Sequence, residues 1–356
     1  MQSSKDIFLT LVRSGIGHET EPIPNQVNWS EIKALADRQG LSAVVLDGIE
    51  RLPNGNRPSK NITLPWIGEV VSNYEQRYHQ YCNAIASLAS FYNSHGIKMM
   101  VLKGYACSLD WLKPNHRPCG DVDIWLFEKQ QEADRLLKIE KKITIDNSHH
   151  HHTVFSWKFF LVENHYDFEN VHHHKSSMLI EKKFKELGKD DTHMTVVNGQ
   201  NVFLPSPNLH ALFLLKHSMT DFAAFYVTLR QVLDWAFFVE KHGKEVDWNW
   251  LLKILDEFHM RDFFDCVNGI CVEDLGFDSN IFPYVKYNQI LKDRVLSDIL
   301  SPKFSRGEPK CLFPRLVFKY RRWLGNSWKH QMCYNESMWS AFWSGLWGHL
   351  MKPSSL

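Results

Sequence analysis

Short stretches with strand periodicity, set in a chain that otherwise has helical periodicity, constrain the fold most. Residues 97–102 are a compact apolar run between two glycines, which predicts a buried strand. Residues 121–127 alternate between apolar and other side chains, as a strand does. Residues 153–168 again show a period of two, and an Asn-Gly pair within residues 194–204 predicts a hairpin. The sequence therefore predicts a small α+β unit with a mixed sheet over residues 96–204.

Helical patterns flank this unit on both sides. The first region ends in a long helical stretch from about Pro65 to Ser94, and Ser30 is the expected N-cap of an earlier helix. The last region is mostly helical, and its tryptophans are expected to pack in the core. A chain of 356 residues is long for one core, so several packed units are expected. We predict an N-terminal helical region (1–95), the α+β core (96–204) and a C-terminal helical region (205–356).

Composition narrows the class of protein. The seven cysteines are odd in number and form no CxxC pair, which argues against a disulfide framework or a cysteine zinc site. No signal-peptide core occurs, and no apolar run approaches the ~18 residues of a membrane span. We expect a soluble, cytoplasmic protein without a membrane span. The formal net charge of +1 leaves a nucleic-acid partner possible but not favoured.

Two carboxylates lie close together in the alternating strand. Asp121 and Asp123 are two residues apart, so both side chains point to one face. Magnesium takes oxygen ligands, chiefly carboxylates, and two-ion sites hold the ions ~4 Å apart, which requires clustered ligands. Glu163, on the polar face of a later predicted strand, offers a third carboxylate. We therefore predict that Asp121, Asp123 and Glu163 are metal ligands and catalytic residues, with two Mg²⁺ ions as cofactor.

Candidate nucleotide-binding residues surround the carboxylates. Lys103 and Gly104 follow the first strand and open a helix, where a glycine lets the backbone approach phosphate. Arg117 can add a planar fork of donors, and Gly120 directly precedes the aspartates. His165 follows Glu163 on the same strand face, where it could orient Glu163 or an acceptor. These five residues complete the predicted site.

The order of these motifs resembles a known family. Leu102-Lys103-Gly104, then the run from Arg117 to Asp123, then Val162-Glu163-Asn164-His165-Tyr166 are similar to the uncharacterised nucleotidyltransferase family of the polymerase-β-like superfamily. Residues 205–217 and 229–234 also resemble its helical half, so the resemblance covers roughly residues 30–350.

The resemblance implies a mixed sheet flanked by helices, with Mg²⁺ bound by Asp121, Asp123 and Glu163. It also implies that Lys103-Gly104 stands where better-known relatives carry Gly-Ser to hold the triphosphate. The implied reaction is transfer of a nucleoside monophosphate from a nucleoside triphosphate to an unidentified hydroxyl acceptor, on a small molecule or a protein. The acceptor and the base preference stay open.

Two other function classes are kept. One is a non-catalytic nucleotide- or ligand-binding protein that retains the fold, and the three acids argue for catalysis against it. The other is an RNA-modifying or toxin-like transferase of the same fold, against which the weak net charge argues.

The remaining histidines have plainer interpretations. Residues 149–152 and 172–174 are histidine runs; consecutive residues on a strand point to alternate faces, so we expect a solvated or cleft-bordering loop. His210 and His217 share one helix face, and Arg230 and Asp234 stand four apart. We expect packed helices with an ordinary Arg230–Asp234 ion pair, against the alternative that these residues line the cleft.

Overall fold

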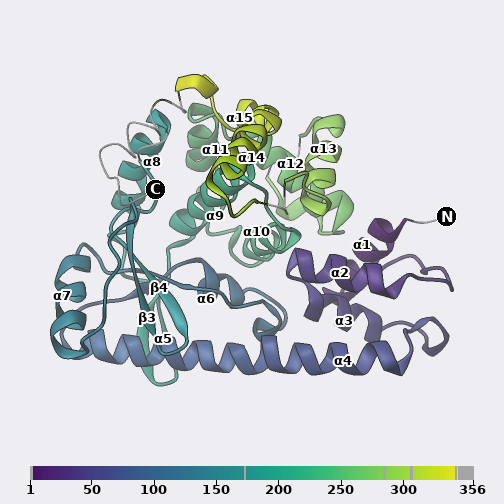
Figure 1. Ribbon diagram of the computed structural model, residues 1–356, viewed down its shortest axis with the longest axis horizontal. Helices are drawn as coiled ribbons and strands as arrows, with labels where there is room; N and C mark the ends of the chain where they lie inside the picture. The colour runs from purple at the N-terminus through teal and green to yellow at the C-terminus, as the bar shows by residue number, and fades with distance from the viewer. Residues whose placement is uncertain (1–2, 172–173, 284–285, 305–307, 341–342, 344–356) are drawn as a thin grey trace.

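The computed structural model describes residues 3–171, 174–283, 286–304, 308–340 and 343. Helices come first along the chain, then a mixed segment of strands and helices, then helices again. Figure 1 shows the sheet on the left, the N-terminal helices on the right and the C-terminal helices above. The predicted α+β class is confirmed.

Six strands form one mixed sheet in the order β3-β4-β2-β1-β6-β5. β2 pairs with β4 in parallel, as β1 does with β6, while the other neighbours are antiparallel. The strands are β1 (Met100–Val101), β2 (Val122–Trp125), β3 (His152–Trp157), β4 (Phe160–His165), β5 (Met194–Val197) and β6 (Gln200–Phe203). β1 and β2 therefore lie in the middle of the sheet, with one hairpin on each side.

Strand β2 is buried along its whole length, because other elements cover both faces of the sheet there. Val122 and Ile124 belong to the hydrophobic core on one face. Trp125 belongs to the core on the other face, where its indole Nε1 donates to the carbonyl of Gly188 at 3.1 Å. The alternation read from the sequence is confirmed, although both faces of the strand are covered.

The other predicted strands are confirmed with changed limits. Only Met100 and Val101 pair in β1, and α6 (Lys103–Ser108) follows almost at once. The predicted strand stretch over residues 153–168 is an antiparallel hairpin, β3–β4, over residues 152–165. Asn198 and Gly199 turn the β5–β6 hairpin with positive φ angles of 46° and 81°, as the Asn-Gly signal predicts.

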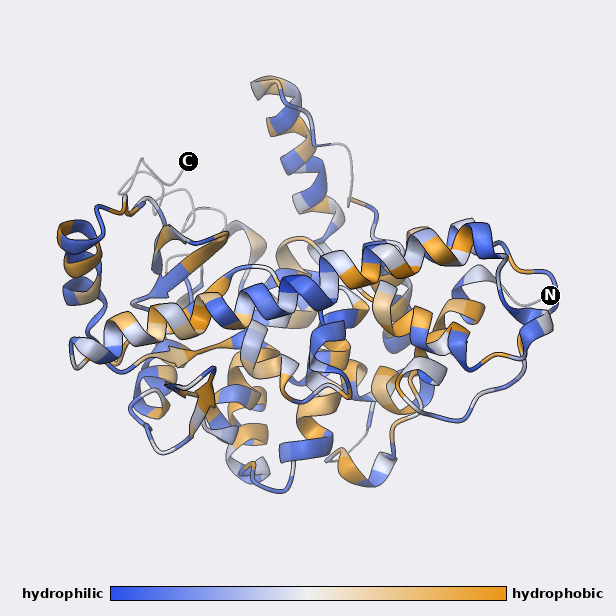
Figure 2. Cartoon of the chain, turned by 90° about the horizontal axis from the view of Figure 1, so that it is seen from below, coloured by the Kyte–Doolittle hydropathy of each residue, from blue (hydrophilic) through white to orange (hydrophobic). Residues whose placement is uncertain are grey.

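One long helical rod connects the two ends of the molecule. It consists of α4 (Lys60–Val70), a π-helical segment (Val71–Gln76) and α5 (Arg77–Ser94). Its first part supplies Trp66 and Val70 to the N-terminal core, and α5 packs on the sheet. Figure 2 shows the rod from below, crossing the molecule with many hydrophilic residues on its outward surface. The predicted helix over residues 65–94 is confirmed.

The N-terminal helices share one hydrophobic core with the C-terminal helices. They are α1 (Ser4–Gly15), α2 (Trp29–Gln39) and α3 (Ser42–Glu50). Buried Gln39 connects the two groups: its amide donates to the carbonyl of Ile299 and accepts from the N–H of Leu229. The N-cap of α2 is Asn28, which accepts from the N–H of Glu31, so the prediction of Ser30 is wrong by two residues.

The remaining helices cover the sheet or build the C-terminal half. They are α7 (Gln130–Glu140), α8 (Lys175–Leu187), α9 (Pro207–Ala224), α10 (Leu229–His242), α11 (Trp248–Glu257), α12 (Arg261–Gly269), α13 (Gln289–Leu300), α14 (Leu312–Gly325) and α15 (Ser327–Cys333). Helix α8 is not predicted from the sequence. The division of the chain into three regions stays a prediction. In the structure α5 packs with the sheet, and the N-terminal and C-terminal helices share one core.

The C-terminal tryptophans pack less than predicted. Trp328 packs against the main core, whereas Trp339 and Trp343 are largely exposed. Trp347 lies outside the described residues. Among the described helices, none has both the length and the apolar character needed to cross a membrane.

Helices α1 and α3 approach each other through two glycines. A Cβ at Gly15 would lie 2.0 Å from the carbonyl oxygen of Val44, and one at Gly48 would lie 2.1 Å from that of Leu11. Backbone atoms cannot move aside as a side chain can, so the close packing requires glycine at both positions.

We expect Gly48→Ala to lower the free energy of unfolding by about 1–3 kcal/mol, because the methyl group forces α1 and α3 apart. Gly68→Ala is the matched control, since nothing lies within 4 Å of a Cβ there. On an exposed helix that change stabilises by up to about 1 kcal/mol. Urea unfolding measures both; equal stability of the two variants would contradict the close packing.

Candidate functional site

Asp123 and Glu163 lie side by side in the middle of the sheet. The parallel register of β2 and β4 pairs Asp123 with Glu163, so the two side chains share a face. Asp121 comes two residues earlier, directly before β2, and remains exposed. Its carbonyl accepts a hydrogen bond of 2.8 Å from the hydroxyl of Tyr81 on α5, which fixes the backbone there. The structure thus brings the three predicted carboxylates to one face of the sheet.

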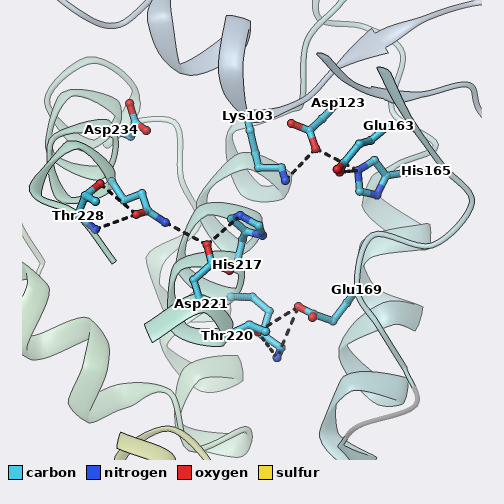
Figure 3. Close-up of polar contacts among 12 residues, drawn as sticks. Lys103, Asp123, Glu163, His165, Glu169, His217, Thr220, Asp221, Thr228 and Asp234 are labelled. Carbon is cyan, nitrogen blue, oxygen red and sulfur yellow. Dashed lines mark hydrogen bonds and ion pairs between the residues drawn. The ribbon is translucent and has the colours of Figure 1, made fainter. Parts of the chain in front are cut away.

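Lys103 is the cation that contacts this group. Its Nζ lies 2.8 Å from Oδ1 of Asp123 (Figure 3). Its φ of 29° falls in the left-handed region that favours glycine, which is the residue type the resemblance places there in relatives. Burial acts to lower the pKa of Lys103, but the carboxylate of Asp123 outweighs it and raises the pKa above its usual value. Lys103 is therefore a fixed positive charge.

His165 contacts the same oxygen from the other side. Its Nε2 lies 3.1 Å from Oδ1 of Asp123 and 3.6 Å from Oε2 of Glu163. Its Nδ1 lies 3.2 Å from the carbonyl of Asp167, which holds the ring in place. Burial acts to lower the pKa of His165, but its contacts with Asp123 and Glu163 raise it to about 9.

The three carboxyl groups differ in their electrostatic surroundings. Burial favours a higher pKa for Asp123, but Lys103 and His165 hold it well below its usual range. Glu163 also has a lowered pKa, because His165 outweighs burial. Desolvation and the neighbouring Asp123 raise the pKa of Asp121. Asp121 is therefore the carboxyl group that a further cation would stabilise most directly.

The two glycines have different surroundings. A Cβ at Gly104 would lie 2.5 Å from the Tyr81 hydroxyl, the same hydroxyl that donates to Asp121. Gly104 therefore makes room for Tyr81 in this structure. Gly120 is exposed, and nothing lies within 4 Å of a Cβ built there.

Arg117 lies in a buried ion pair and not among the carboxylates. Its Nε and Nη2 donate to the two carboxylate oxygens of Asp234 at 2.7 and 2.9 Å, and Nη1 contacts the carbonyl of Pro118 at 3.3 Å. The indole of Trp111 also donates to Asp234, at 2.9 Å. The expectation that Arg117 contacts phosphate is corrected, because protein acceptors already engage all three nitrogens.

The expected ion pair between Arg230 and Asp234 on helix α10 is wrong. Asp234 pairs with Arg117 and not with Arg230, four residues away. The side chain of Arg230 instead passes Gly40. Desolvation and the charge of Arg117 lower the pKa of Arg230, while Asp234 and Asp121 act in the opposite direction. The sequence left open whether Arg230 packs in a helix pair or lines a cleft, and Asp121 is among the acids whose charge acts on it.

Helix α9 contributes residues that sequence patterns left undecided. Figure 3 shows His217 below the Lys103 ammonium, with its Nε2 3.3 Å from Oδ2 of Asp221. Desolvation and Lys103 lower the pKa of His217 well below its usual value. Burial raises the pKa of Asp221 to about 6. His210, by contrast, is buried against Phe238, so the packed-helix interpretation holds for His210, whereas His217 lies beside Asp221 and near Lys103.

The first histidine run ends inside the site. His152 opens β3 and is buried, and His151 is half-buried beside it. Burial lowers the pKa of His151 to about 2 and that of His152 to about 4, so both rings are neutral at pH 7. In the second run, residues 172 and 173 lie outside the described residues.

The donor set fits a magnesium ion. Asp123, Glu163 and His165 offer ligand atoms that all lie within 4.8 Å of one another. Buried Asp123, half-buried Glu163 and exposed Asp121 are hard oxygen donors, as Mg²⁺ requires. Lys103 and His165 both bind Oδ1 of Asp123, so they compete with a cation at that one oxygen.

Comparisons with known proteins give one clear result. A family model described as "Uncharacterised nucleotidyltransferase" matches residues 25–276. The crystal structure of an antigenic nucleotidyltransferase-like protein from Paracoccidioides brasiliensis is 18% identical, with a TM-score of 0.33 over 45% of this chain and 75% of that one. A likeness at that score supports no argument here. No curated protein matches the chain.

We expect Asp234→Asn to lower the free energy of unfolding by about 3–5 kcal/mol, because it leaves the buried Arg117 guanidinium without its counter-charge. The double variant Arg117→Met with Asp234→Asn removes that unpaired charge and recovers part of the loss. Chemical denaturation of both variants measures the difference. If the double variant is no more stable than Asp234→Asn alone, the loss of stability does not come from the unpaired charge of Arg117.

Proposed function

The chain belongs to the uncharacterised nucleotidyltransferase family, and on that premise we propose that it transfers a nucleoside monophosphate from a nucleoside triphosphate to a hydroxyl acceptor, with Mg²⁺. The observation that carries the proposal is the register of β2 and β4, which sets Asp123 beside Glu163 with Asp121 two residues away. Three carboxylates on one face of a sheet match the oxygen-ligand preference of magnesium. The acceptor belongs to a small molecule or a protein.

The residues of the chain would act as follows. Asp121, Asp123 and Glu163 hold the metal, which when bound lowers the pKa of the acceptor hydroxyl and offsets charge on the leaving pyrophosphate. His165 positions Asp123 and Glu163 through its Nε2, while its Nδ1 contact with Asp167 keeps the ring from turning. Tyr81 keeps the backbone of Asp121 in place. These contacts make the carboxylates a preorganised group.

The phosphates need cations, and we assign this role to Lys103 and Arg230. Lys103 already lies against Asp123, so its ammonium is next to the expected metal position. Arg230 takes the role expected of Arg117, because its charge is coupled to Asp121 while Asp234 is engaged by Arg117. A desolvated guanidinium binds phosphate through charge-assisted hydrogen bonds.

One observation favours a second candidate, a nucleotide-binding protein without transfer activity. Lys103 and His165 both contact Oδ1 of Asp123 and form an ion triad with it. If this ion triad persists when nucleotide binds, Oδ1 of Asp123 is closed to metal and the site binds without reacting. The RNA-modifying alternative gains no such support, since the net charge is only +1.

The deciding measurement is the melting temperature with each nucleoside triphosphate, with and without Mg²⁺. We expect at least one triphosphate to raise it in the presence of Mg²⁺, by linkage of binding to folding. Asp121→Asn should abolish the Mg²⁺-dependent part and keep the fold, because Asp121 is exposed. Asp167→Asn is the control, because the carboxylate of Asp167 pairs with Lys185 and is not one of the proposed metal ligands. A Mg²⁺-dependent shift that survives in Asp121→Asn would overturn the metal assignment.

A shift without Mg²⁺ dependence, and no pyrophosphate released with any acceptor tried, would favour the second candidate. Release of pyrophosphate with a hydroxyl acceptor would exclude it. The same preparation of the protein therefore suffices to distinguish a transferase from a protein that only binds nucleotide.

We expect Arg230→Met to weaken Mg²⁺-triphosphate binding about 10- to 100-fold, the effect of losing a hydrogen bond to a charged group worth about 1.5–3 kcal/mol. Calorimetric titration measures this. Arg135→Met, on α7, removes an equal charge outside the site and should leave the affinity unchanged. Equal affinity of the Arg230 variant and the wild type would exclude Arg230 from the phosphate site.

A further inference from the structure

Three imidazole rings gather beside the Asp123–Glu163 pair. His151, His152 and His165 each offer one ring nitrogen, and these nitrogens lie within 4.8 Å of one another. The ring centroids of His151 and His152 are 4.2 Å apart, and those of His152 and His165 are 5.2 Å apart. The sequence predicts that neighbouring histidines of the run point to opposite faces of a strand, so that their rings would not gather at one place. The structure differs because His151 lies just before β3 begins, where the chain is not yet extended.

Backbone contacts hold this cluster in place. The antiparallel register of β3 and β4 sets His152 opposite His165. The carbonyl of His151 accepts the N–H groups of both Tyr166 and Asp167, each at 3.1 Å. A bridge between Asp146 and Val154 closes the loop that carries the run. The cluster is thus a built part of the sheet and not a chance meeting of surface histidines.

Several ring nitrogens of the cluster are buried without a hydrogen bond. They are Nδ1 of His151 and both ring nitrogens of His152, which itself is 6% exposed. A buried polar atom without a partner is unfavourable and calls for a ligand, an ion or a water. His165 is different: its Nδ1 contacts the carbonyl of Asp167, the arrangement by which proteins orient a metal-binding histidine.

Glu163 completes a possible ligand set. Its Oε1 lies 3.8 Å from Nε2 of His152, and its Oε2 lies 3.6 Å from Nε2 of His165. Three imidazoles and one carboxylate suit zinc and similar transition metals, whereas magnesium prefers oxygen ligands alone. Metal bonds of about 2.0–2.1 Å set tetrahedral ligand atoms about 3.4 Å apart, which small side-chain rotations can reach.

We propose that His151, His152, His165 and Glu163 bind a divalent transition-metal ion of the zinc type. This inference goes beyond the proposed function and does not depend on it, because such an ion would bind without nucleotide. Glu163 belongs to both ligand sets, with the oxygen ligands Asp121 and Asp123 on one side of it and the three imidazoles on the other.

Cobalt is the probe, because a tetrahedral Co²⁺ ion with nitrogen ligands absorbs visible light. Metal-stripped full-length protein is titrated with Co²⁺, and Zn²⁺ is then added in competition. We expect one equivalent of Co²⁺ to bind with a visible band that Zn²⁺ removes. His151→Ala and His152→Ala should each weaken binding at least about tenfold. His149→Ala is the matched control from the same run, since His149 stacks on His152 and lies 3.8 Å from Asp146 but is not one of the proposed ligands.

Unchanged Co²⁺ affinity in both His151→Ala and His152→Ala would overturn the proposal, as would an equal loss in His149→Ala, which would indicate adventitious binding by the run. Circular dichroism checks that the variants fold. If His152→Ala does not fold, the half-buried His151 carries the test.

Magnesium separates this inference from the proposed function. Millimolar Mg²⁺ should leave the Co²⁺ band in place, whereas displacement by Mg²⁺ would assign the ion to the oxygen ligands and overturn the proposal. The Mg²⁺-dependent nucleotide shift is measured independently on His151→Ala. A normal nucleotide shift without Co²⁺ binding in the wild type refutes the imidazole site alone; Co²⁺ binding without a nucleotide shift refutes the proposed function alone.

Discussion

The parallel pairing of β2 with β4 is the contact on which the candidate site depends. It sets Asp123 opposite Glu163 and Trp125 opposite His165, and the β3–β4 hairpin then sets His152 opposite His165. A slip of one residue would turn every side chain of the strand to the other face. Trp125 opposes such a slip, because its large ring is buried and its indole is bonded to Gly188. A hydrophobic anchor therefore sets the position of the polar group.

Two buried carboxylates show how differently charge can be accommodated in this fold. Asp234 receives a bidentate guanidinium from Arg117 and an indole N–H from Trp111, so both of its oxygens are engaged. Asp123 receives Lys103 and His165 on a single oxygen. The first arrangement joins the loop before β2 to helix α10 and has little room for a ligand. The second is asymmetric, as expected of a group that exchanges one partner for another.

The sequence predicts what is local and misses what is distant. The alternation of β2 and the Asn-Gly turn of β5–β6 are local patterns, so they identify the strand and the hairpin correctly. The partner of Arg117 is 117 residues away in the chain, and no local spacing points to it. The spacing of Arg230 and Asp234 suggested a helix pair worth only ~0.5 kcal/mol, which a buried bidentate contact readily overrides. The place of His151 was missed because strand alternation was applied to the whole histidine run, of which only His152 lies in β3.

The rod formed by α4, the π-helical segment and α5 affects how the protein unfolds. Tyr74 lies in the core that unites the two helical regions, while Tyr81, two turns further along, reaches the backbone of Asp121. Both cores therefore share one continuous backbone hydrogen-bond ladder. Partial unfolding of the helical half cannot leave the carboxylates undisturbed unless the rod breaks between these two tyrosines. The same rod therefore couples the unfolding of the helical half to the loss of the carboxylate site.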